Sequence, residues 1–279
     1  SGYLPGLFKR EPELVAITAA MPDGTGLSAL RKQMPERVYD VGMSEGHAVT
    51  FAAGLAAGGL RPVVAIYSTF LQRSLDNIIH DVALQDLPVI FLVDRAGLVG
   101  DDGPTHHGLF DISYLRMIPN MTVMAPRDEA EMARMIETAL TVQGPVAIRY
   151  PRGSGTGKAP SSKLNALKYG RGEFISKGNS EIMIVSTGIM DEPARRAVEM
   201  LKKKKVNVCH YDLKFIKPLP DELFEIIVKN KIAGVVSIED GIVAGGAGSA
   251  ILEEISVRKM DVKVRLIGVN DTFSTHGTQ

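Results

Sequence analysis

The polar, charged and aromatic residues that could do chemistry gather in three segments of the first half of the chain. These segments are YDVGMSEGHAV at residues 39–49, IYSTFLQR at residues 66–73, and DRAGLVGDDGPTHHG at residues 94–108. Each comes at the end of an apolar run that is typical of a buried strand. Because ligands bind at the carboxyl ends of the strands in an open α/β sheet, the three segments predict one shared site.

The carboxylate of Glu45 lies at the start of an Ala- and Gly-rich stretch that predicts a helix. An acid in the first turn of a helix also suits the helix dipole, so its position leaves a purely structural role open. The functional interpretation is a partly buried carboxylate that shares a proton with a ligand nitrogen. Tyr67 and Phe70 are equally typical of a core, and Arg73 of a solvated helix face, so these three residues alone decide nothing.

The segment at residues 94–108 has no apolar periodicity, and two adjacent histidines, His106 and His107, stand in it among glycines and acids. Such a pair in a Gly-rich loop at a strand end favours a function. Adjacent side chains diverge, and no third His or Cys stands at a ligand spacing, so we expect no zinc site. Arg95 and Arg152 also follow strands, and a guanidinium matches the geometry of a phosphate. For Arg152, an exposed charge before a linker is the alternative.

The elements that must position these residues alternate between strand and helix along the chain. Strands are predicted at residues 14–18, 37–40, 62–66, 88–93, 121–124, 146–150, 181–186, 206–212, 234–239 and 262–267, and helices at residues 45–58, 73–85, 128–142, 192–204, 220–229 and up to 257. Residues 153–162 have the Gly/Ser-rich composition of a linker. We expect an α/β fold with two three-layer α/β/α domains and mostly parallel sheets, at residues 1–153 and 169–279, joined by a linker at residues 154–168.

The composition excludes several classes of protein. Lys plus Arg and Asp plus Glu number 32 each in 279 residues, so a nucleic acid or an anionic membrane is not an expected partner. The one cysteine, Cys209, excludes an internal disulfide and fits a reducing compartment. No apolar run has transmembrane length, and no signal peptide is visible. We expect a cytoplasmic protein, or a plastid one if a transit segment has been removed.

The motifs resemble those of the 1-deoxy-D-xylulose-5-phosphate synthases, which are thiamine-diphosphate enzymes of the transketolase superfamily. The matching strings are EGHAVTFAAG (45–54), AIYSTFLQR (65–73), DRAGLVG (94–100), DGPTHHG (102–108) and RYPRG (149–153). IEDG (238–241) and GGAGS (245–249) are similar to the C-terminal domain of the superfamily. The resemblance covers nearly the whole chain, and it implies a transketolase-like pyrimidine-binding domain followed by a transketolase C-terminal domain.

The resemblance implies an enzyme that decarboxylates pyruvate and joins the two-carbon unit to glyceraldehyde 3-phosphate. The product, 1-deoxy-D-xylulose 5-phosphate, is a precursor of isoprenoids, thiamine and pyridoxal. In this family an N-terminal domain binds the diphosphate of thiamine diphosphate and its Mg²⁺ through a motif that this chain lacks. We therefore expect part of a longer or cleaved enzyme that needs this domain as a partner. A homodimer is expected, and the isolated chain is expected to be inactive.

The resemblance also implies roles for individual residues. Glu45 bonds the aminopyrimidine ring, Phe70 stacks on it and Arg73 lies beside it, and catalysis rests on Glu45 and His106. Contacts with the substrates and intermediates come from Tyr67, Arg95, Asp102, His106 and Arg152, of which Arg95 and Arg152 anchor the phosphate of glyceraldehyde 3-phosphate.

Three alternatives stay open. The C-terminal subunit of a split transketolase and the β subunit of a 2-oxoacid dehydrogenase share this architecture, although the strings at residues 67–73 and 94–108 argue against both. A non-catalytic assembly module is the third, since the diphosphate-binding motif is absent from the sequence.

Overall fold

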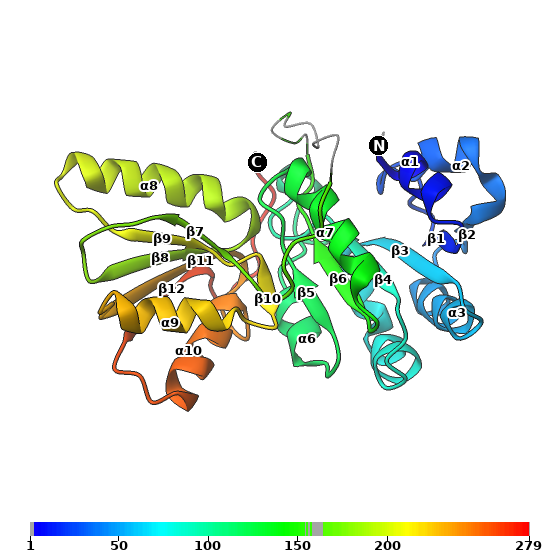
Figure 1. The fold of residues 1–279 in the computed structure, drawn as a ribbon. Helices are drawn as coiled ribbons and strands as arrows, with labels where there is room; N and C mark the ends of the chain where they lie inside the picture. Colours follow the sequence, from blue (N-terminus) through cyan, green and yellow to red (C-terminus); the bar gives the residue numbers. More distant parts are fainter. Residues whose placement is uncertain (1–2, 154, 156, 158–163, 279) are drawn as a thin grey trace.

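The computed structural model describes residues 3–153, 155, 157 and 164–278. Within these ranges the strands form two sheets, and Figure 1 shows helices packed against the faces of each. Both sheets are mostly parallel, which confirms the predicted α/β fold class. The linker predicted at residues 154–168 lies partly outside the described residues, so its character stays a prediction.

The first sheet has the strand order β10-β5-β6-β4-β3-β1-β2, in which β10 alone among the described strands runs antiparallel to its neighbour. Its strands are β1 (Leu14–Thr18), β2 (Val38–Asp40), β3 (Arg61–Tyr67), β4 (Ile90–Asp94), β5 (Thr122–Met124), β6 (Val146–Arg149) and β10 (Phe215–Lys217). The strands β1, β4 and β6 are buried along their whole length, as central parallel strands covered on both faces should be.

Helices cover both faces of this sheet. Buried side chains of α1 (Tyr3–Arg10), α2 (Ser28–Gln33) and α7 (Glu129–Thr141) pack on one face, and those of α3 (Glu45–Ala57) and α6 (Asp111–Met117) pack on the other. A 3-10 turn, η1 (Pro35–Arg37), leads into β2. The helix predicted from residue 128 begins at Glu129, and Asp128 caps it because its side chain accepts a hydrogen bond from the Glu131 amide, 2.9 Å away.

The helix predicted at residues 73–85 is a chain of shorter turns. These are α4 (Ser68–Leu71), η2 (Gln72–Ser74), α5 (Leu75–Asn77) and the π-helical η3 (Ile78–Ala83). Asn77 donates hydrogen bonds to Thr50 on α3 and to Asp81 within the π turn, and Thr50 also bonds Asp81. These tertiary contacts hold the widened turn, so the spacing of the apolar residues could not reveal it.

The second sheet has the strand order β12-β11-β8-β9-β7, in which β7 is antiparallel to β9. Its strands are β7 (Glu173–Ser176), β8 (Ile182–Ser186), β9 (Cys209–Asp212), β11 (Gly234–Ile242) and β12 (Lys263–Val269). The helix α8 (Asp191–Lys203) covers one face, and α9 (Asp221–Lys229) and α10 (Ala247–Val257) cover the other (Figure 1). A 3-10 turn, η5 (Gly188–Met190), precedes α8. Sequence patterns had not predicted β7 or β10, which are short.

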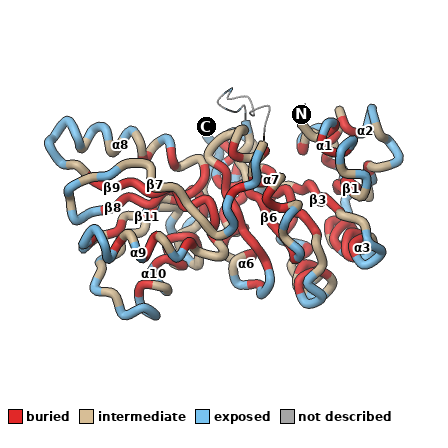
Figure 2. The backbone as a smooth tube through the Cα atoms, in the orientation of Figure 1, coloured by how far each residue is buried: buried red, intermediate tan, exposed pale blue. Residues whose placement is uncertain are grey.

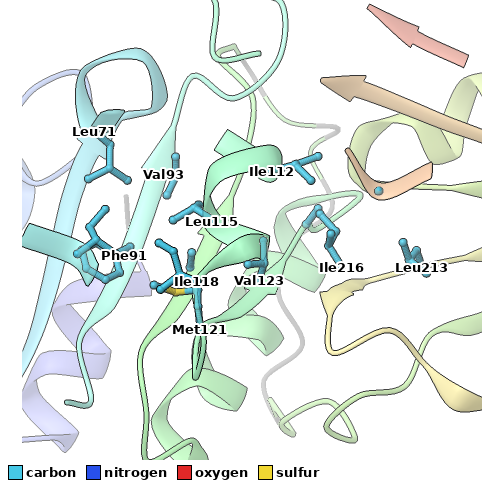
Figure 3. Close-up of a cluster of buried hydrophobic side chains, with 14 of the residues drawn as sticks. Leu71, Phe91, Val93, Ile112, Leu115, Ile118, Met121, Val123, Leu213 and Ile216 are labelled. Carbon is cyan, nitrogen blue, oxygen red and sulfur yellow. The ribbon is translucent and has the colours of Figure 1, made fainter. Parts of the chain in front are cut away.

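One hydrophobic core runs through both sheets. Ile112 and Leu115 on α6 belong to the same buried cluster as Leu213 and Ile216 from the second half of the chain (Figure 3). Strand β10 crosses between the halves, since it follows β9 in sequence yet pairs with β5 of the first sheet. Buried residues therefore continue across the junction (Figure 2). Within the described ranges, every helix is too short or too polar to pass through a lipid bilayer.

Candidate functional site

The three residues predicted to contact a cofactor lie together. Glu45 is the first residue of α3, which follows β2 after the connection at residues 41–44, and it is only 6% exposed. Arg73, in η2, places Nη1 3.2 Å from Glu45 Oε1. The same guanidinium lies over the ring of Phe70, 5.4 Å from its centroid. A buried carboxylate, a cation and an aromatic face thus meet at one end of the sheet.

An aromatic cluster connects these residues to the segment at residues 94–108. The Phe70 ring stacks on Tyr67, with centroids 5.8 Å apart, and meets the edge of His106, with centroids 5.4 Å apart. Tyr67 ends β3 and Phe70 lies one turn later in α4, so the strand end and the following helix place both rings. Burial raises the pKa of Tyr67, although the nearby Arg95 opposes the shift.

Two guanidinium groups share one carboxylate beside this cluster. Arg95 lies over the Tyr67 ring, 3.6 Å from its centroid. Arg95 Nε is 3.7 Å, and Arg152 Nε 3.1 Å, from the same oxygen of Asp102, Oδ2. Arg95 Nη1 also lies 3.4 Å from Asp94 Oδ2, so two guanidinium groups face two carboxyl groups here. The planar donors of both arginines match the oxygens of an anion such as phosphate. The structure therefore brings Arg95, Asp102 and Arg152 together, and their contact with a substrate stays a prediction.

Asp94 is a buried carboxyl group that sequence patterns did not single out. It ends β4 and accepts a hydrogen bond from the Arg95 amide, 2.6 Å from Oδ1. Burial raises its pKa to about 6, against the lowering effect of Arg95. Arg95 has a φ of +59°, a conformation that non-glycine residues rarely adopt, and the Asp94 carboxyl holds it there. The signal that could have found Asp94 is an acid closing an apolar strand directly before a predicted anion-binding arginine.

The segment at residues 97–108, called here the 97–108 loop, is closed at its base by reciprocal main-chain bonds. Gly97 N donates to Gly108 O at 2.7 Å, and Gly108 N donates to Gly97 O at 2.8 Å. A side chain at Gly108 would meet Arg95 O at 2.3 Å, so only glycine fits there. The two histidines diverge as predicted, since His106 faces the aromatic cluster and His107 is buried inside the loop.

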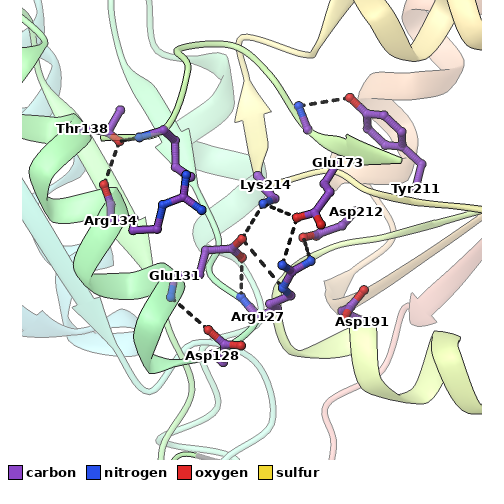
Figure 4. Close-up of polar contacts among 12 residues, drawn as sticks. Arg127, Asp128, Glu131, Arg134, Thr138, Glu173, Asp191, Tyr211, Asp212 and Lys214 are labelled. Atoms are coloured by element: carbon purple, nitrogen blue, oxygen red, sulfur yellow. Dashed lines mark hydrogen bonds and ion pairs between the residues drawn. The ribbon is translucent and has the colours of Figure 1, made fainter. Parts of the chain in front are cut away.

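An acidic cluster at the junction of the two halves is the strongest metal-like arrangement in the part of the chain that the structure describes. It consists of Glu131, Glu173 and Asp212. Lys214 Nζ lies 2.7 Å from Glu131 Oε1 and 2.6 Å from Glu173 Oε2, and Arg127 Nη1 lies 3.2 Å from Asp212 Oδ2 (Figure 4). The ammonium group of Lys214 stands where a cation would bind, so the cluster serves as an ion-pair network between the two halves.

Two family models match this chain. The model of the pyrimidine-binding domain of transketolase matches residues 3–157, and that of the transketolase C-terminal domain matches residues 170–279. The chain belongs to the transketolase family. The predicted resemblance is thus confirmed, and the site described above lies in the stretch that matches the pyrimidine-binding model.

This transketolase-family chain has many curated relatives. It is 48% identical over 277 residues to 1-deoxy-D-xylulose-5-phosphate synthase 1 of Geobacter sulfurreducens and 51% identical over 271 residues to the 1-deoxy-D-xylulose-5-phosphate synthase of Carboxydothermus hydrogenoformans. These matches cover 99% and 97% of this chain but only 43% of each relative. The chain therefore spans less than half the length of these relatives.

A solved structure of the same family has a very similar fold. It is described as a split gene transketolase in the form of an inactive beta4 tetramer, and it superposes with a TM-score of 0.87 at 29% identity. The match covers 98% of this transketolase-family chain and 88% of the other. Both sheets and their packing therefore belong to the family's architecture.

Proposed function

We propose that this chain supplies the pyrimidine-binding and substrate-binding residues of a thiamine-diphosphate-dependent 1-deoxy-D-xylulose-5-phosphate synthase. The enzyme would take a two-carbon unit from pyruvate, with loss of CO₂, and join it to glyceraldehyde 3-phosphate. The observation that carries the proposal is the buried carboxylate of Glu45 joined through Arg73 to the face of Phe70. Identities of about half with the synthases, against 29% with the split transketolase, favour this reaction over transketolase chemistry.

The residues at this end of the sheet fit an aminopyrimidine ring. Glu45 is a buried acceptor that can share a proton with a ring nitrogen, Phe70 offers a face for stacking, and Arg73 orients the Glu45 carboxylate. Thiamine diphosphate, when bound, supplies the nucleophilic carbon that attacks a 2-oxoacid. The protein's part is then to orient the ring and to hold a proton at the Glu45 carboxylate.

The neighbouring residues fit a phosphorylated aldehyde. A phosphate dianion offers Arg95 and Arg152 more acceptor oxygens than the single carboxylate of Asp102, and Asp102 keeps the two side chains close together until the phosphate arrives. His106 meets the Phe70 ring, with centroids 5.4 Å apart. The Thr105 hydroxyl forms a hydrogen bond with Nδ1 of His106 at 3.0 Å. We therefore assign proton exchange with substrate oxygens to Nε2 of His106. Tyr67 packs beneath Arg95 and excludes water from its face.

The diphosphate group and Mg²⁺ require ligands that we assign to a separate N-terminal domain. This chain covers 43% of the length of its curated relatives, which leaves room for such a domain. The proposal therefore includes a partner, either a further part of the same protein or a second subunit. The chain alone is expected to bind thiamine diphosphate weakly and to turn nothing over.

The decisive experiment adds the diphosphate-binding domain of a synthase relative in trans and follows pyruvate-dependent release of CO₂. We expect release that depends on glyceraldehyde 3-phosphate, on thiamine diphosphate and on Mg²⁺, and that Glu45→Ala abolishes. A complex that uses ketose phosphates but not pyruvate would show that transketolase is the right assignment. Calorimetry of the chain alone gives a second test, since a Kd below about 1 μM for thiamine diphosphate would contradict an incomplete site.

A further inference from the structure

His107 joins the 97–108 loop to the C-terminal tail, which is defined here as residues 270–278. The side chain is 5% exposed, and both of its ring nitrogens meet main-chain groups. Val99 N donates to His107 Nδ1 at 3.1 Å, and His107 Nε2 lies 3.2 Å from the carbonyl oxygen of Thr275. An amide can only donate and a carbonyl can only accept, so Nδ1 carries no proton and Nε2 carries one. One neutral imidazole thus bonds the loop with one nitrogen and the tail with the other.

We infer that His107 is a positioning residue, which clamps the tail onto the 97–108 loop and so holds Asp102 and His106 where a substrate needs them. The inference rests on the proposed function, because it assigns a purpose to a contact outside the substrate site. His107 itself touches no reacting group, since its ring lies inside the loop and His106 faces the aromatic cluster.

Two further contacts show that the loop and the tail are built to meet. The amide of Gly277 donates to the carbonyl of Gly100, 3.2 Å away, two residues before Asp102. Gly103 has a φ of +76°, and a Cβ at this position would lie 3.2 Å from Cβ of His276. A larger residue at Gly103 would therefore push the tail away from the segment that carries Asp102.

The second sheet braces the base of the same loop. A Cβ at Gly97 would lie 2.2 Å from Asp240 Oδ2, and the amide of Ile242 donates to the carbonyl of Leu109 at 3.0 Å. Both Asp240 and Ile242 belong to β11. The second half of the chain thus supports the loop at its base through β11 and at its tip through the tail. In this way residues of the second half help to position the site that lies in the first half.

The consequence for catalysis is specific to the acceptor. Asp102 closes the 3-10 turn η4 (Gly100–Asp102) and is the shared partner of Arg95 and Arg152. Release of the tail would free Gly100 and let Asp102 move, so the two guanidinium groups would lose their common anchor. Glu45 and its partner Arg73 both lie outside the 97–108 loop. Binding of thiamine diphosphate should therefore not change.

The first test uses hydrogen exchange of main-chain amides in the chain alone. His107→Leu removes both bonds, whereas His107→Gln keeps one acceptor and one donor. His80→Leu is the control, because His80 is an exposed histidine bonded to Asp76 on the surface. In His107→Leu we expect the Gly277 amide, which does not itself bond His107, to exchange about tenfold faster. His107→Gln, His80→Leu and the amides of β1 should match the wild type. An unchanged Gly277 amide in His107→Leu overturns the clamp.

The second test measures the consequence in the complex with the diphosphate-binding domain. His107→Leu should raise KM for glyceraldehyde 3-phosphate about fivefold to tenfold, leave the Kd of thiamine diphosphate unchanged, and be rescued by His107→Gln. An unchanged KM with faster exchange at Gly277 refutes the positioning role. Absence of activity in the wild-type complex would count against the proposed function instead, because the exchange experiment does not depend on turnover.

Deletion of residues 275–279, which leaves His107 in place, must also speed hydrogen exchange at the Val99 amide. An unchanged exchange rate at Val99 in the truncated chain would contradict the inference.

Discussion

Arg73 and Glu45 form an ion pair between an exposed guanidinium group and a buried carboxylate. Arg73 Nη1 lies 3.2 Å from Glu45 Oε1, while the Glu45 side chain is 7% exposed and the Arg73 side chain 64%. The same guanidinium rests against the ring of Phe70. Arg73 therefore links the buried carboxylate of Glu45 to the aromatic ring of Phe70.

Replacement of Glu45 by Gln should remove activity without unfolding the chain. The amide cannot exchange a proton with a ring nitrogen, so we expect the rate of CO₂ release in the complex to fall at least about 100-fold. The melting temperature should stay close to that of the wild type, because Gln keeps the volume of the side chain. Steady-state kinetics and thermal unfolding measure the two quantities. Glu36→Gln, at an exposed position in η1, is the control, and equal activities of the two variants would refute a role for Glu45.

Replacement of Arg152 by Gln should weaken binding of the phosphorylated acceptor. A charged hydrogen bond to phosphate is lost, so we expect KM for glyceraldehyde 3-phosphate to rise about tenfold or more. Unphosphorylated glyceraldehyde should be affected much less, which separates a phosphate contact from a general defect. Arg196→Gln, on the exposed face of α8, is the matched control. A similar loss with both aldehydes would mean that Arg152 does not hold the phosphate.

Replacement of Arg149 by Met should destabilise the junction between the two sheets. Arg149 is buried and bonds Asp111 Oδ2 from Nε at 3.0 Å and Asp240 Oδ1 from Nη1 at 2.6 Å. Its removal leaves two buried carboxyl groups without their cation, so we expect the free energy of unfolding to fall by about 3–5 kcal/mol. Urea denaturation measures this. Adding Asp111→Asn and Asp240→Asn should recover part of the loss, and a single variant as stable as the wild type would show that the cation is dispensable.

Replacement of Asp94 by Asn should flatten the dependence of stability on pH. The pKa of Asp94 is raised from 3.8 to about 6 in the folded chain, so the folded state keeps a proton that the unfolded state has lost. The contribution of this group to stability therefore falls as the pH rises from about 4 to about 6. Asp94→Asn should remove up to about 3 kcal/mol of this decline. Urea midpoints at pH 4, 5, 6 and 7 test it, with Asp23→Asn as an exposed control. If the urea midpoints of the wild type and of Asp94→Asn change with pH in the same way, titration of Asp94 does not contribute to the pH dependence of stability.

Much of the site could be predicted because it lies at the ends of strongly apolar strands. The runs that became β3 and β4 are recognisable locally, and in a parallel sheet residues just after adjacent strands must lie at the same edge. Tyr67 and Arg95 are such residues, and their contact follows from the pairing of β3 with β4. The family resemblance then supplied roles that spacing alone left open, most clearly for Glu45.

Other features depend on contacts between distant parts of the chain. Strand β10 joins the first sheet because Phe215 pairs with Met124, and the shared core decides this pairing. Asp94 has the sequence pattern of an ordinary strand end, and only the structure shows the burial that raises its pKa. His107 was recognisable only as the neighbour of His106, since its two partners are main-chain groups that carry no mark in the sequence.

The sequence by itself determined the class of fold, the family, and which strands are followed by polar and charged residues. It could do so because apolar periodicity and motif spacing are local properties. The tertiary structure alone decided that Arg73 faces Glu45, that two arginines share Asp102, and that the tail closes over the loop. Each of these depends on where separate segments meet, which is set by packing of the common core.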